Sequence, residues 1–476
     1  AHCGNAGYGV FAALWQKTFQ PTGRRDCTKA CGLARRAQSD LSAVWAMQCP
    51  LGQRQMTMGL AIRIILILAM TFGVTATARA NDKIAPYSAA LSRAAYEISI
   101  GNFPAAVRSG RAAFALARTD NEQVGAARLV ASAHFRAGHY SRAEWWLRRA
   151  LHNADDSALP ILGQEFSAVR QKNPLTVRLN FSLAPSDNIN NGSPFETVKI
   201  GNLPHLLTPD ARALSGLEMA LFLDTTYRIA QADNFATNLG FILFGRAYEL
   251  SPGAKNAAPD ISAGDYNFGV VEVSINHARR FPGSSGPSVF ALHIGQNWYG
   301  GAVYTRYQRF NVSQEFRPGG DIAWQVFSSF EHQVSPYNAN TPSQIFTLGG
   351  SVTRNLKNGD GIKVSLQGQQ TTSSDSNNEY YALKSSLRYG FGRPVLGNAL
   401  SLSATLEARD YAYSFYEPTG RQDLSLSGGA TMVFPNVSYF GFSPSVSVEA
   451  RTKRSNVDLF DRRRSLAVRM GIQSNF

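Results

Sequence analysis

The sequence predicts an α+β multidomain protein in which a small all-α domain precedes a C-terminal transmembrane antiparallel β-barrel of about 14 strands. Three observations lead to this prediction: an apolar leader begins at Met58, residues 86–172 are alanine-rich with helical periodicity, and apolar and polar residues alternate from Leu175 onward. The expected segments are an over-extended, disordered start, a signal peptide, a periplasmic helical domain and an outer-membrane barrel, at 1–57, 58–80, 81–172 and 173–476.

The leader has the three parts of a secretory signal peptide. Arg63 precedes the apolar run 64–74, and Ala78 and Ala80 form a small-x-small cleavage site. We therefore expect the mature chain to begin at Asn81. A transmembrane helix is the alternative, but the run is shorter than the roughly 20 apolar residues that a span needs.

Cysteine and charge exclude several classes of function. All four cysteines lie at Cys3, Cys27, Cys31 and Cys49. Whatever follows therefore has no disulfide, thiolate metal site or cysteine nucleophile, and no metal or cofactor is expected. Residues 1–80 also hold nine of the 47 basic residues and two of the 33 acidic ones, so the net charge falls from +14 to +7. Nucleic acid is not an expected partner of a chain with so little excess charge.

Two stretches of the helical region match each other with an offset of 37 residues. The matching positions, small or aromatic in both copies, are Ala94, Gly101, Phe103 and Ala106, and then Ala131, Gly138, Tyr140 and Ala143. Small residues are needed where paired helices approach closely, and the offset is near the tetratricopeptide period of about 34 residues. The first copy is degenerate, since Gly110 stands where a large apolar residue is expected. An ordinary pair of helical hairpins is the alternative.

A tetratricopeptide-like arrangement would place one helix face of the second copy toward a binding partner. The residues of that face are Arg128, Ser132, Phe135 and Arg136. Arginine and aromatic residues are favoured at binding hot spots, so this face is a candidate site for an acidic, partly unfolded client. In the other interpretation, Phe135 packs inward and both arginines are only solvated.

From Leu175 the alternation has the period of a strand with one apolar and one polar face. Strands are expected near 175–183, 216–230, 235–248, 265–277, 288–298, 302–308, 323–333, 343–356, 362–371, 380–389, 400–411, 421–434, 443–452 and 462–476. A β-sandwich would not explain fourteen evenly spaced strands together with a signal peptide, the absence of cysteine and a terminal Phe476. We interpret Phe476 as an assembly signal for the barrel-insertion machinery. Aromatic residues near strand ends, such as Trp298, Tyr380 and Tyr411, are typical of interfacial girdles.

The connections between these strands also fit a barrel. If the helical domain is periplasmic, the first strand runs outward and the odd-numbered connections should be the long ones. Most are, including 185–215, 249–264, 334–342 and 412–420. Two connections break the pattern, because 299–301 is too short for an external loop and 309–322 is too long for a periplasmic turn.

Other chemistry has little support in the sequence. The barrel histidines His205, His277, His293 and His332 show no pattern with serine and acidic residues that would indicate catalysis, so an enzyme is not expected. The run 462–464 is three arginines, which we interpret as a loop end near lipopolysaccharide phosphates rather than as a client-binding rim. Calcium binding at 187–190 is less favoured than turn formation, because Asn side chains commonly bond within their own turns.

The barrel resembles that of the surface lipoprotein assembly modifiers, the Slam family. The first strand and its exit, Leu179–Asn190, are similar to the family's barrel-opening signature, within which we select Pro185, Asp187, Asn188 and Asn190. The last hairpin is similar as well, with Gly441-Phe442-Ser443-Pro444, then Ser455-Asn456, then Phe460-Asp461. The resemblance covers roughly residues 86–476, but the helical part is short, with one degenerate repeat.

The resemblance implies transport without hydrolysis. Such proteins move surface lipoproteins or secreted proteins across the outer membrane, so the implied partners are a client protein, the insertion machinery, and outer-membrane lipid with lipopolysaccharide. No phosphate-cradling loop is evident, and the energy would have to come from client folding outside. The alternative is a passive porin or channel with a periplasmic helical anchor.

Overall fold

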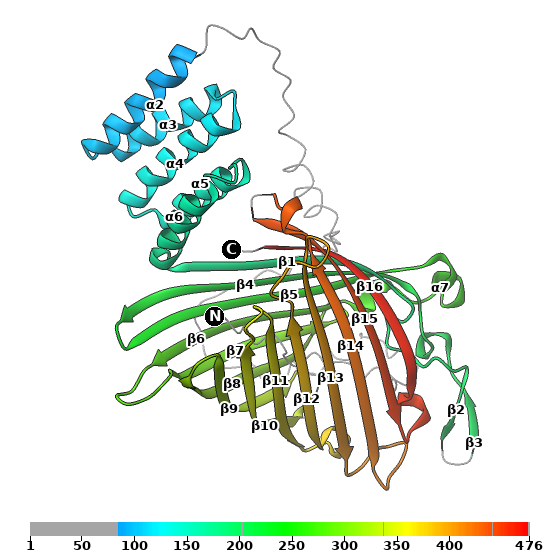
Figure 1. The fold of residues 1–476 in the computed structure, drawn as a ribbon. Helices are drawn as coiled ribbons and strands as arrows, with labels where there is room; N and C mark the ends of the chain where they lie inside the picture. Colours follow the sequence, from blue (N-terminus) through cyan, green and yellow to red (C-terminus); the bar gives the residue numbers. More distant parts are fainter. Residues whose placement is uncertain (1–83, 201–202, 337, 440, 475–476) are drawn as a thin grey trace, which may run out of the picture. The chain divides into compact units, whose positions relative to one another are not determined.

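The computed structural model describes residues 84–200, 203–336, 338–439 and 441–474. It confirms the predicted class: five helices among these residues come first, and fourteen strands then form a closed antiparallel barrel (Figure 1). The segment 1–57, the signal peptide with Ala78 and Ala80, and the terminal Phe476 lie outside the described residues.

The helical domain consists of short antiparallel helices. They are α2 (Ile84–Ser99), α3 (Phe103–Leu116), α4 (Asp120–Arg136), α5 (Tyr140–His152) and α6 (Leu159–Lys172). Side chains satisfy free backbone N–H groups at two of the helix starts. Asn102 Oδ1 accepts from the N–H of Ala105 at α3, and Thr119 forms a reciprocal capping box with Glu122 at α4.

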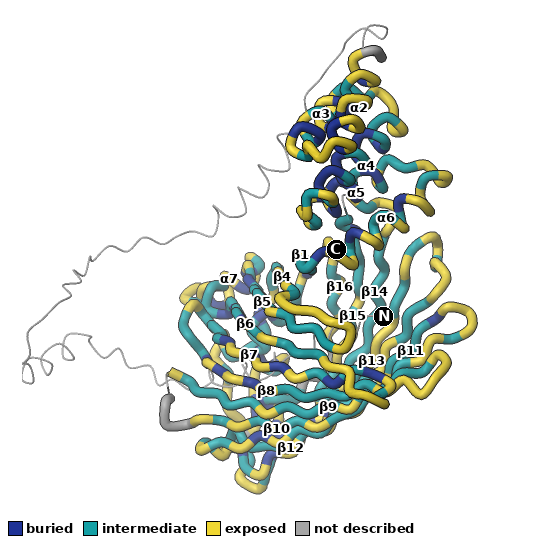
Figure 2. Tube along the Cα trace, turned by 90° about the vertical axis from the view of Figure 1, so that its left-hand side faces the viewer, coloured by how far each residue is buried: buried dark blue, intermediate teal, exposed yellow. Residues whose placement is uncertain are grey.

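Alanines allow these helices to pack closely. The main apolar cluster joins α4, α5 and α6 through Val130, Trp146, Leu147 and Leu162, with Phe114 of α3 packed against it. Ala127, Ala143 and Ala150 fill the space between these larger side chains and are fully buried. Figure 2 shows this concentration of buried residues inside the helical domain.

The barrel strands pair in sequence order and close between the first and the last. They are β1 (Leu175–Ser186), β4 (Gly216–Ala232), β5 (Phe235–Leu250), β6 (Phe268–Arg279), β7 (Ser288–Tyr299), β8 (Ala302–Gly319), β9 (Ile322–Ser335), β10 (Asn338–Asn355), β11 (Gly361–Ser373), β12 (Tyr380–Gly390), β13 (Ala399–Tyr411), β14 (Arg421–Val433), β15 (Phe442–Ser455) and β16 (Arg462–Ser474). We call the end where β1 begins proximal and the end where β1 finishes distal.

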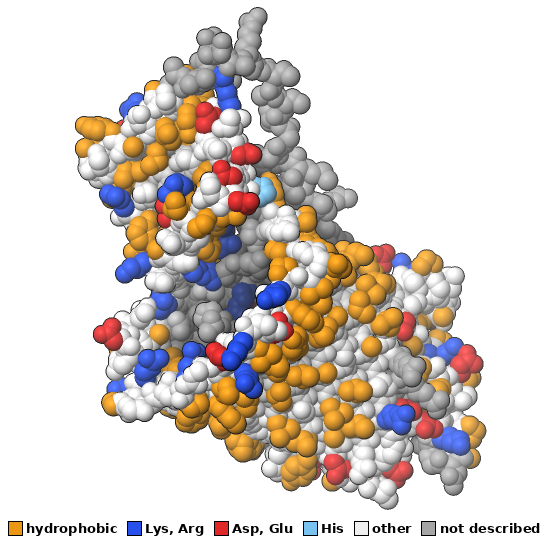
Figure 3. Space-filling model, viewed as in Figure 1, with side chains coloured by type: hydrophobic (Ala, Val, Ile, Leu, Met, Phe, Trp, Pro, Cys, Tyr) orange, Lys and Arg blue, Asp and Glu red, His pale blue; other side chains and the backbone are white. Residues whose placement is uncertain are grey.

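The outer face of the barrel is apolar. Large hydrophobic side chains are exposed at alternate strand positions, for example Leu292 and Ile294 on β7 and Leu424 and Leu426 on β14. Figure 3 shows them spread over the strands of one face. Strands cross lipid as a closed barrel with an apolar exterior, so this barrel spans an outer membrane. No helix among the described residues is long and apolar enough to cross a membrane.

Two predicted connections are wrong. The expected connection 309–322 is mostly strand, because β8 continues the alternation through Phe310, Val312 and Phe316 and turns only after Gly319. The expected connection 334–342 is shorter for the same reason, since β10 already begins at Asn338.

The short connection at 299–301 is a tight turn. Gly300 and Gly301 both have positive φ, at 57° and 80°, which is the requirement of the two-residue turn that suits twisted strands. The rule that all distal connections are long therefore fails here, and it fails again between β9 and β10.

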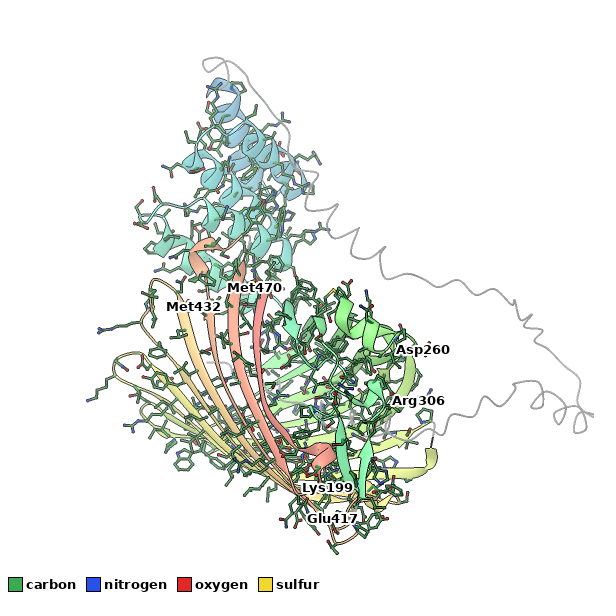
Figure 4. The ribbon with its side chains drawn as sticks, turned by 90° about the vertical axis from the view of Figure 1, so that its right-hand side faces the viewer. Lys199, Asp260, Arg306, Glu417, Met432 and Met470 are labelled. Atoms are coloured by element: carbon green, nitrogen blue, oxygen red, sulfur yellow. The ribbon has the colours of Figure 1, made fainter. Side chains whose placement is uncertain are left out.

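The longest distal connections carry structure of their own. The β1–β4 connection contains the hairpin of β2 (Thr197–Ile200) and β3 (Leu203–Leu206), and the β5–β6 connection contains the short helix α7 (Pro252–Ala257). An apolar cluster joins these two connections through Ile189, Leu214, Ala254 and Tyr266. Figure 4 shows Lys199 of β2 and Glu417 of the β13–β14 connection at the same end of the barrel, with Met432 and Met470 toward the other end.

Candidate functional site

The structure places the two matching stretches in equivalent turns between helices. Gly101 and Gly138 follow α2 and α4 with φ values of 79° and 76°, a conformation that favours glycine. Phe103 and Tyr140 begin the next helices, and the four alanines at the matching positions, Ala94, Ala106, Ala131 and Ala143, are buried between helices.

Gly110, the position that makes the first copy degenerate, has a local packing reason. It is buried in α3, and a Cβ atom there would lie 2.6 Å from Cγ2 of Val130 on α4. Glycine therefore lets α3 approach α4 more closely than a large side chain would.

The candidate client face on α4 does not present a free aromatic residue flanked by two free arginines. Arg128 forms a bidentate ion pair with Glu165 of α6, and this hydrogen bonding raises the pKa of its guanidinium. Phe135 packs against the main apolar cluster and meets the Tyr140 ring edge to face at 5.6 Å. Ser132 is half-buried, which leaves Arg136 as the exposed member. Phe135 is partly buried, as the second interpretation expects, and client binding at this face stays a prediction.

A different surface of the helical domain combines arginine with an exposed tryptophan. On α5 the Trp145 side chain is 42% exposed, and the guanidinium carbon of Arg149 lies 4.1 Å from its ring centroid. Arg111 of α3 stands 5.8 Å from the ring of the neighbouring Trp146, and Arg142 is exposed one turn before Trp146. We call Arg111, Arg142, Trp145 and Arg149 the α3–α5 surface. Sequence reasoning missed it, although the Trp-Trp-x-Arg-Arg run was visible.

This surface lies near a buried histidine with an altered acidity. Desolvation, together with the charges of His139, Arg142 and Arg111, lowers the pKa of His134 from 6.5 to about 4. His134 Nδ1 is buried and has no hydrogen-bond partner. The side chain is therefore neutral at pH 7, and protonating it would place a cation among cations.

The inner wall of β6–β9 holds a network of buried polar side chains centred on Glu272. Its Oε1 lies 2.8 Å from His293 Nδ1, and its Oε2 accepts from Tyr307 Oη at 2.7 Å and from Arg309 Nη2 at 2.6 Å. Arg309 also contacts Glu331 at 3.0 Å. These residues face inward because their neighbours Val273 and Leu292 are exposed outward.

A second network lies on the inner wall of β13–β15. Arg421 is fully buried, with its guanidinium carbon 3.7 Å from the Tyr411 ring centroid and 4.4 Å from that of Phe460. Asp423 contacts Arg421 at 3.2 Å and Lys453 at 2.9 Å. Tyr411 was expected in an interfacial girdle. It is instead buried inside the barrel wall, because it covers Arg421.

The residues of the barrel-opening motif build the distal loop rather than an open site. Asn190 Nδ2 donates to the carbonyls of Asp210 and Arg212, and its Oδ1 accepts from the N–H of Leu214 at 2.9 Å. Pro185 lies in β1, Asp187 is exposed, and Asn188 donates to Gly192 O at 2.9 Å. The stretch therefore ties the two sides of the β1–β4 connection together.

The motif residues of the last hairpin have a related role at the same end. Asn456 Oδ1 accepts from Gln422 N at 2.8 Å, its Nδ2 donates to Gly420 O, and Ser455 Oγ accepts from Val457 N. Val457 and Leu459 then pack against Val198 of β2. We call this cluster, with Leu207, Tyr416 and Phe460 around it, the distal clasp. It joins the first and last distal connections of the barrel.

The remaining candidate groups show no catalytic arrangement. His293 contacts Glu272, His277 contacts Thr237 Oγ1 at 2.9 Å, His205 is exposed on β3, and His332 lies on β9. Across the described part of the chain, no three His, Cys, Asp or Glu residues are grouped so that they could hold a metal ion. The side chains of the arginine run 462–464 lie outside what the structure describes.

Comparison by sequence finds no matching family model and no matching curated protein. Comparison by structure finds outer-membrane barrels. OccAB3 of Acinetobacter baumannii is 8% identical with a TM-score of 0.36, covering 63% of this chain and 98% of that one. The anion-selective porin of Comamonas acidovorans is 11% identical with a TM-score of 0.33, covering 63% and 99%. The KdgM porin in complex with disordered oligogalacturonate is 14% identical with a TM-score of 0.25, covering 44% and 94%.

Proposed function

We propose that this protein is an outer-membrane translocator of the Slam kind, which moves a surface lipoprotein or another secreted protein across the outer membrane. The observation that carries the proposal is the helical domain in the same chain as the barrel. A passive pore works with its barrel alone, whereas stacked helical hairpins form binding surfaces for polypeptides.

The charge of the helical domain indicates which polypeptides it would bind. Residues 84–172 contain 11 basic and 7 acidic side chains. Several acidic groups are already engaged, since Glu97 pairs with Arg93, Glu165 with Arg128 and the buried Glu144 with Arg148 and Arg170. Arg111 and Arg142 are exposed, and Arg111 lies 5.8 Å from the ring of Trp146, the neighbour of Trp145. An acidic client segment that contains an aromatic residue is therefore the best match for the α3–α5 surface.

The lumen suits a polypeptide for a related reason. Its charges are largely compensated locally, as Glu272 with Arg309 and Asp423 with Lys453 show. A wall of paired charges offers polar contacts without holding either sign of charge strongly. Placement of the helical domain in the periplasm, assembly by the insertion machinery and contacts with lipopolysaccharide belong to the same proposal. The transport would use no nucleotide and would draw energy from client folding outside the cell.

The test uses the intact chain with two substitutions on the proposed docking surface, Arg142→Glu and Trp145→Ala. Surface display of a client lipoprotein encoded beside this protein would be measured with the barrel abundance in the same membranes. The matched control is Lys172→Glu, an exposed basic residue in the last turn of α6. Loss of display with normal abundance, and no loss in the control, supports the proposal.

Two other outcomes would reject it. Display that is unchanged in the double variant removes the α3–α5 surface from the mechanism. A wild-type barrel that displays no client and conducts ions steadily in planar bilayers would instead support the passive porin.

A further inference from the structure

The barrel closes through an unusually short ladder. The described residues of β1 and β16 form four pairs, from Asn180 with Gln473 to Leu183 with Met470. Every other neighbouring pair of barrel strands forms ten or more. The closing ladder therefore joins the middle of β1 to the proximal end of β16, near Met470 in Figure 4.

Both strands continue beyond the point where this ladder stops. The register would next pair Ala184 with Arg469, but Ala184–Ser186 pair only with β4, and Ser465–Arg469 pair only with β15. In Figure 1 the two strands lie together near the C-terminus and separate toward their other ends. Residues 465–469 of β16 thus form a strand edge with one neighbour among the described residues, and such an edge presents N–H and C=O groups for pairing.

Beyond the end of the backbone ladder, side-chain contacts connect β16 and its preceding connection to the other side of the seam. Arg469 Nη2 reaches Glu218 Oε1 of β4 at 2.8 Å, and Glu218 lies directly opposite Ala184. At the distal end, the distal clasp joins β2, which follows β1, to the connection that precedes β16. An ion pair and an apolar contact can exchange partners without unfolding either strand.

From these observations we infer that the 465–469 edge of β16 is a pairing site for an extended polypeptide strand, which adds to the barrel wall by backbone hydrogen bonds. The inference rests on the proposed function, because the occupant to which we assign the edge is a segment of the exported protein.

The side chains of the edge define the chemistry of that strand. Leu466 and Val468 are exposed outward, and Ala467 and Arg469 face inward. A matching strand therefore alternates apolar residues toward the lipid with small or acidic residues toward the lumen. An acidic residue opposite Arg469 can take the place of Glu218.

The test is disulfide capture of synthetic peptides by the full chain in detergent. The native cysteines are first replaced by serine, at Cys3, Cys27, Cys31 and Cys49. Ala467→Cys then puts one thiol on the edge. The matched control is Ser427→Cys, which also faces the lumen but lies on β14, a strand paired on both sides. Heat-modifiable migration on gels verifies that each barrel is folded.

Three peptides of equal length distinguish the possibilities. One alternates valine with serine and carries a glutamate and a cysteine, the second has the same composition in scrambled order, and the third has lysine for glutamate. Docking raises the local thiol concentration, so we expect capture of the first peptide at Ala467→Cys to be about tenfold faster than at Ser427→Cys. We also expect the scrambled and lysine peptides to react slowly, and Arg469→Gln to remove the preference for glutamate.

Equal capture rates for the patterned and scrambled peptides, or for the two cysteine positions, would overturn the inference. A second edge variant, Leu466→Cys, should capture a peptide whose cysteine is shifted by one residue, since neighbouring residues of a strand face opposite sides. If client display fails in cells while peptide capture persists, the proposed function is rejected. The 465–469 edge would still be a pairing site for an extended strand.

Discussion

In the helical domain the least exposed side chains are mostly alanine and aliphatic residues, whereas in the barrel many of them are charged or polar. Ala106 and Val130 are fully buried between helices, and Arg421 and Glu272 are almost fully buried in the barrel wall. The helical domain is thus stabilised chiefly by close packing, and the barrel by its backbone ladder together with pairing of lumen charges. Substitutions should therefore affect the two regions by different mechanisms.

The largest expected effect is on the helical domain. Trp146→Ala empties the centre of the main apolar cluster, and truncation of a buried aromatic residue costs about 3–5 kcal/mol of folding free energy. Helical circular dichroism should fall while the barrel stays heat-modifiable. Trp145→Ala on the same helix is the control, and a loss of helicity as large as that of Trp146→Ala would contradict the packing argument.

A smaller effect is expected in the barrel wall. Glu272→Ala leaves Arg309 with one acidic partner and His293 with none across β6–β7, at a cost of about 3 kcal/mol. The temperature at which the folded band shifts on gels should fall, with the helical signal unchanged. Glu449→Ala removes a more exposed carboxylate and should have little effect. The prediction is wrong if both variants melt like the wild type.

A substitution in the β1–β4 connection should destabilise that connection without affecting the rest of the barrel. Asn190→Ala removes the hydrogen bonds that join Asp210, Arg212 and Leu214, a loss of about 2 kcal/mol. Hydrogen exchange should accelerate over 187–215 and stay unchanged in strands β10–β13. Asp187→Ala, at an exposed position of the same motif, provides the comparison, and faster exchange throughout the barrel would show that the loop supports more than itself.

The last expected effect appears only as the pH falls, and it again separates the two regions. His134 has a folded-state pKa of about 4, below its unfolded value of 6.5, so the unfolded chain binds the proton more readily. The contribution of neutral His134 to stability is present above pH 6.5 and is lost as the pH falls toward 4. Helical melting temperatures should decline through that range, and His134→Gln should decline less. A decline of equal size in this variant would assign the effect to other groups.

Alternation of side chains was sufficient to predict the number of barrel strands, because each of these strands has one apolar face. It was not sufficient for every boundary. The strand expected over 302–308 continues to Gly319, because the alternation is maintained through Phe310 and Phe316. In the helical domain, the turn glycines Gly101 and Gly138 could be found from the offset of 37 residues alone.

The candidate site was less accessible to sequence reasoning. The contact between Glu272 and His293 depends on the register of β6 and β7, and a shift of one residue would turn one of them outward. The exposure of the Phe135 ring could not be predicted, because it depends on which side chains pack beside α4, and in the structure the Tyr140 ring packs against it. The short β1–β16 ladder could not be predicted from the alternation of either strand, because alternation shows which face is apolar and not how far two strands pair.

The distal clasp also has a consequence for quality control during biogenesis. Val198 comes from the first connection of the barrel, and Val457 and Leu459 come from the last, so the cluster is complete only when nearly the whole chain has been inserted. A barrel truncated before the last hairpin would lack Val457 and Leu459 and would leave Val198 less covered. Cell-envelope proteases that cut the less covered β2–β3 hairpin would then remove incomplete barrels and spare finished ones.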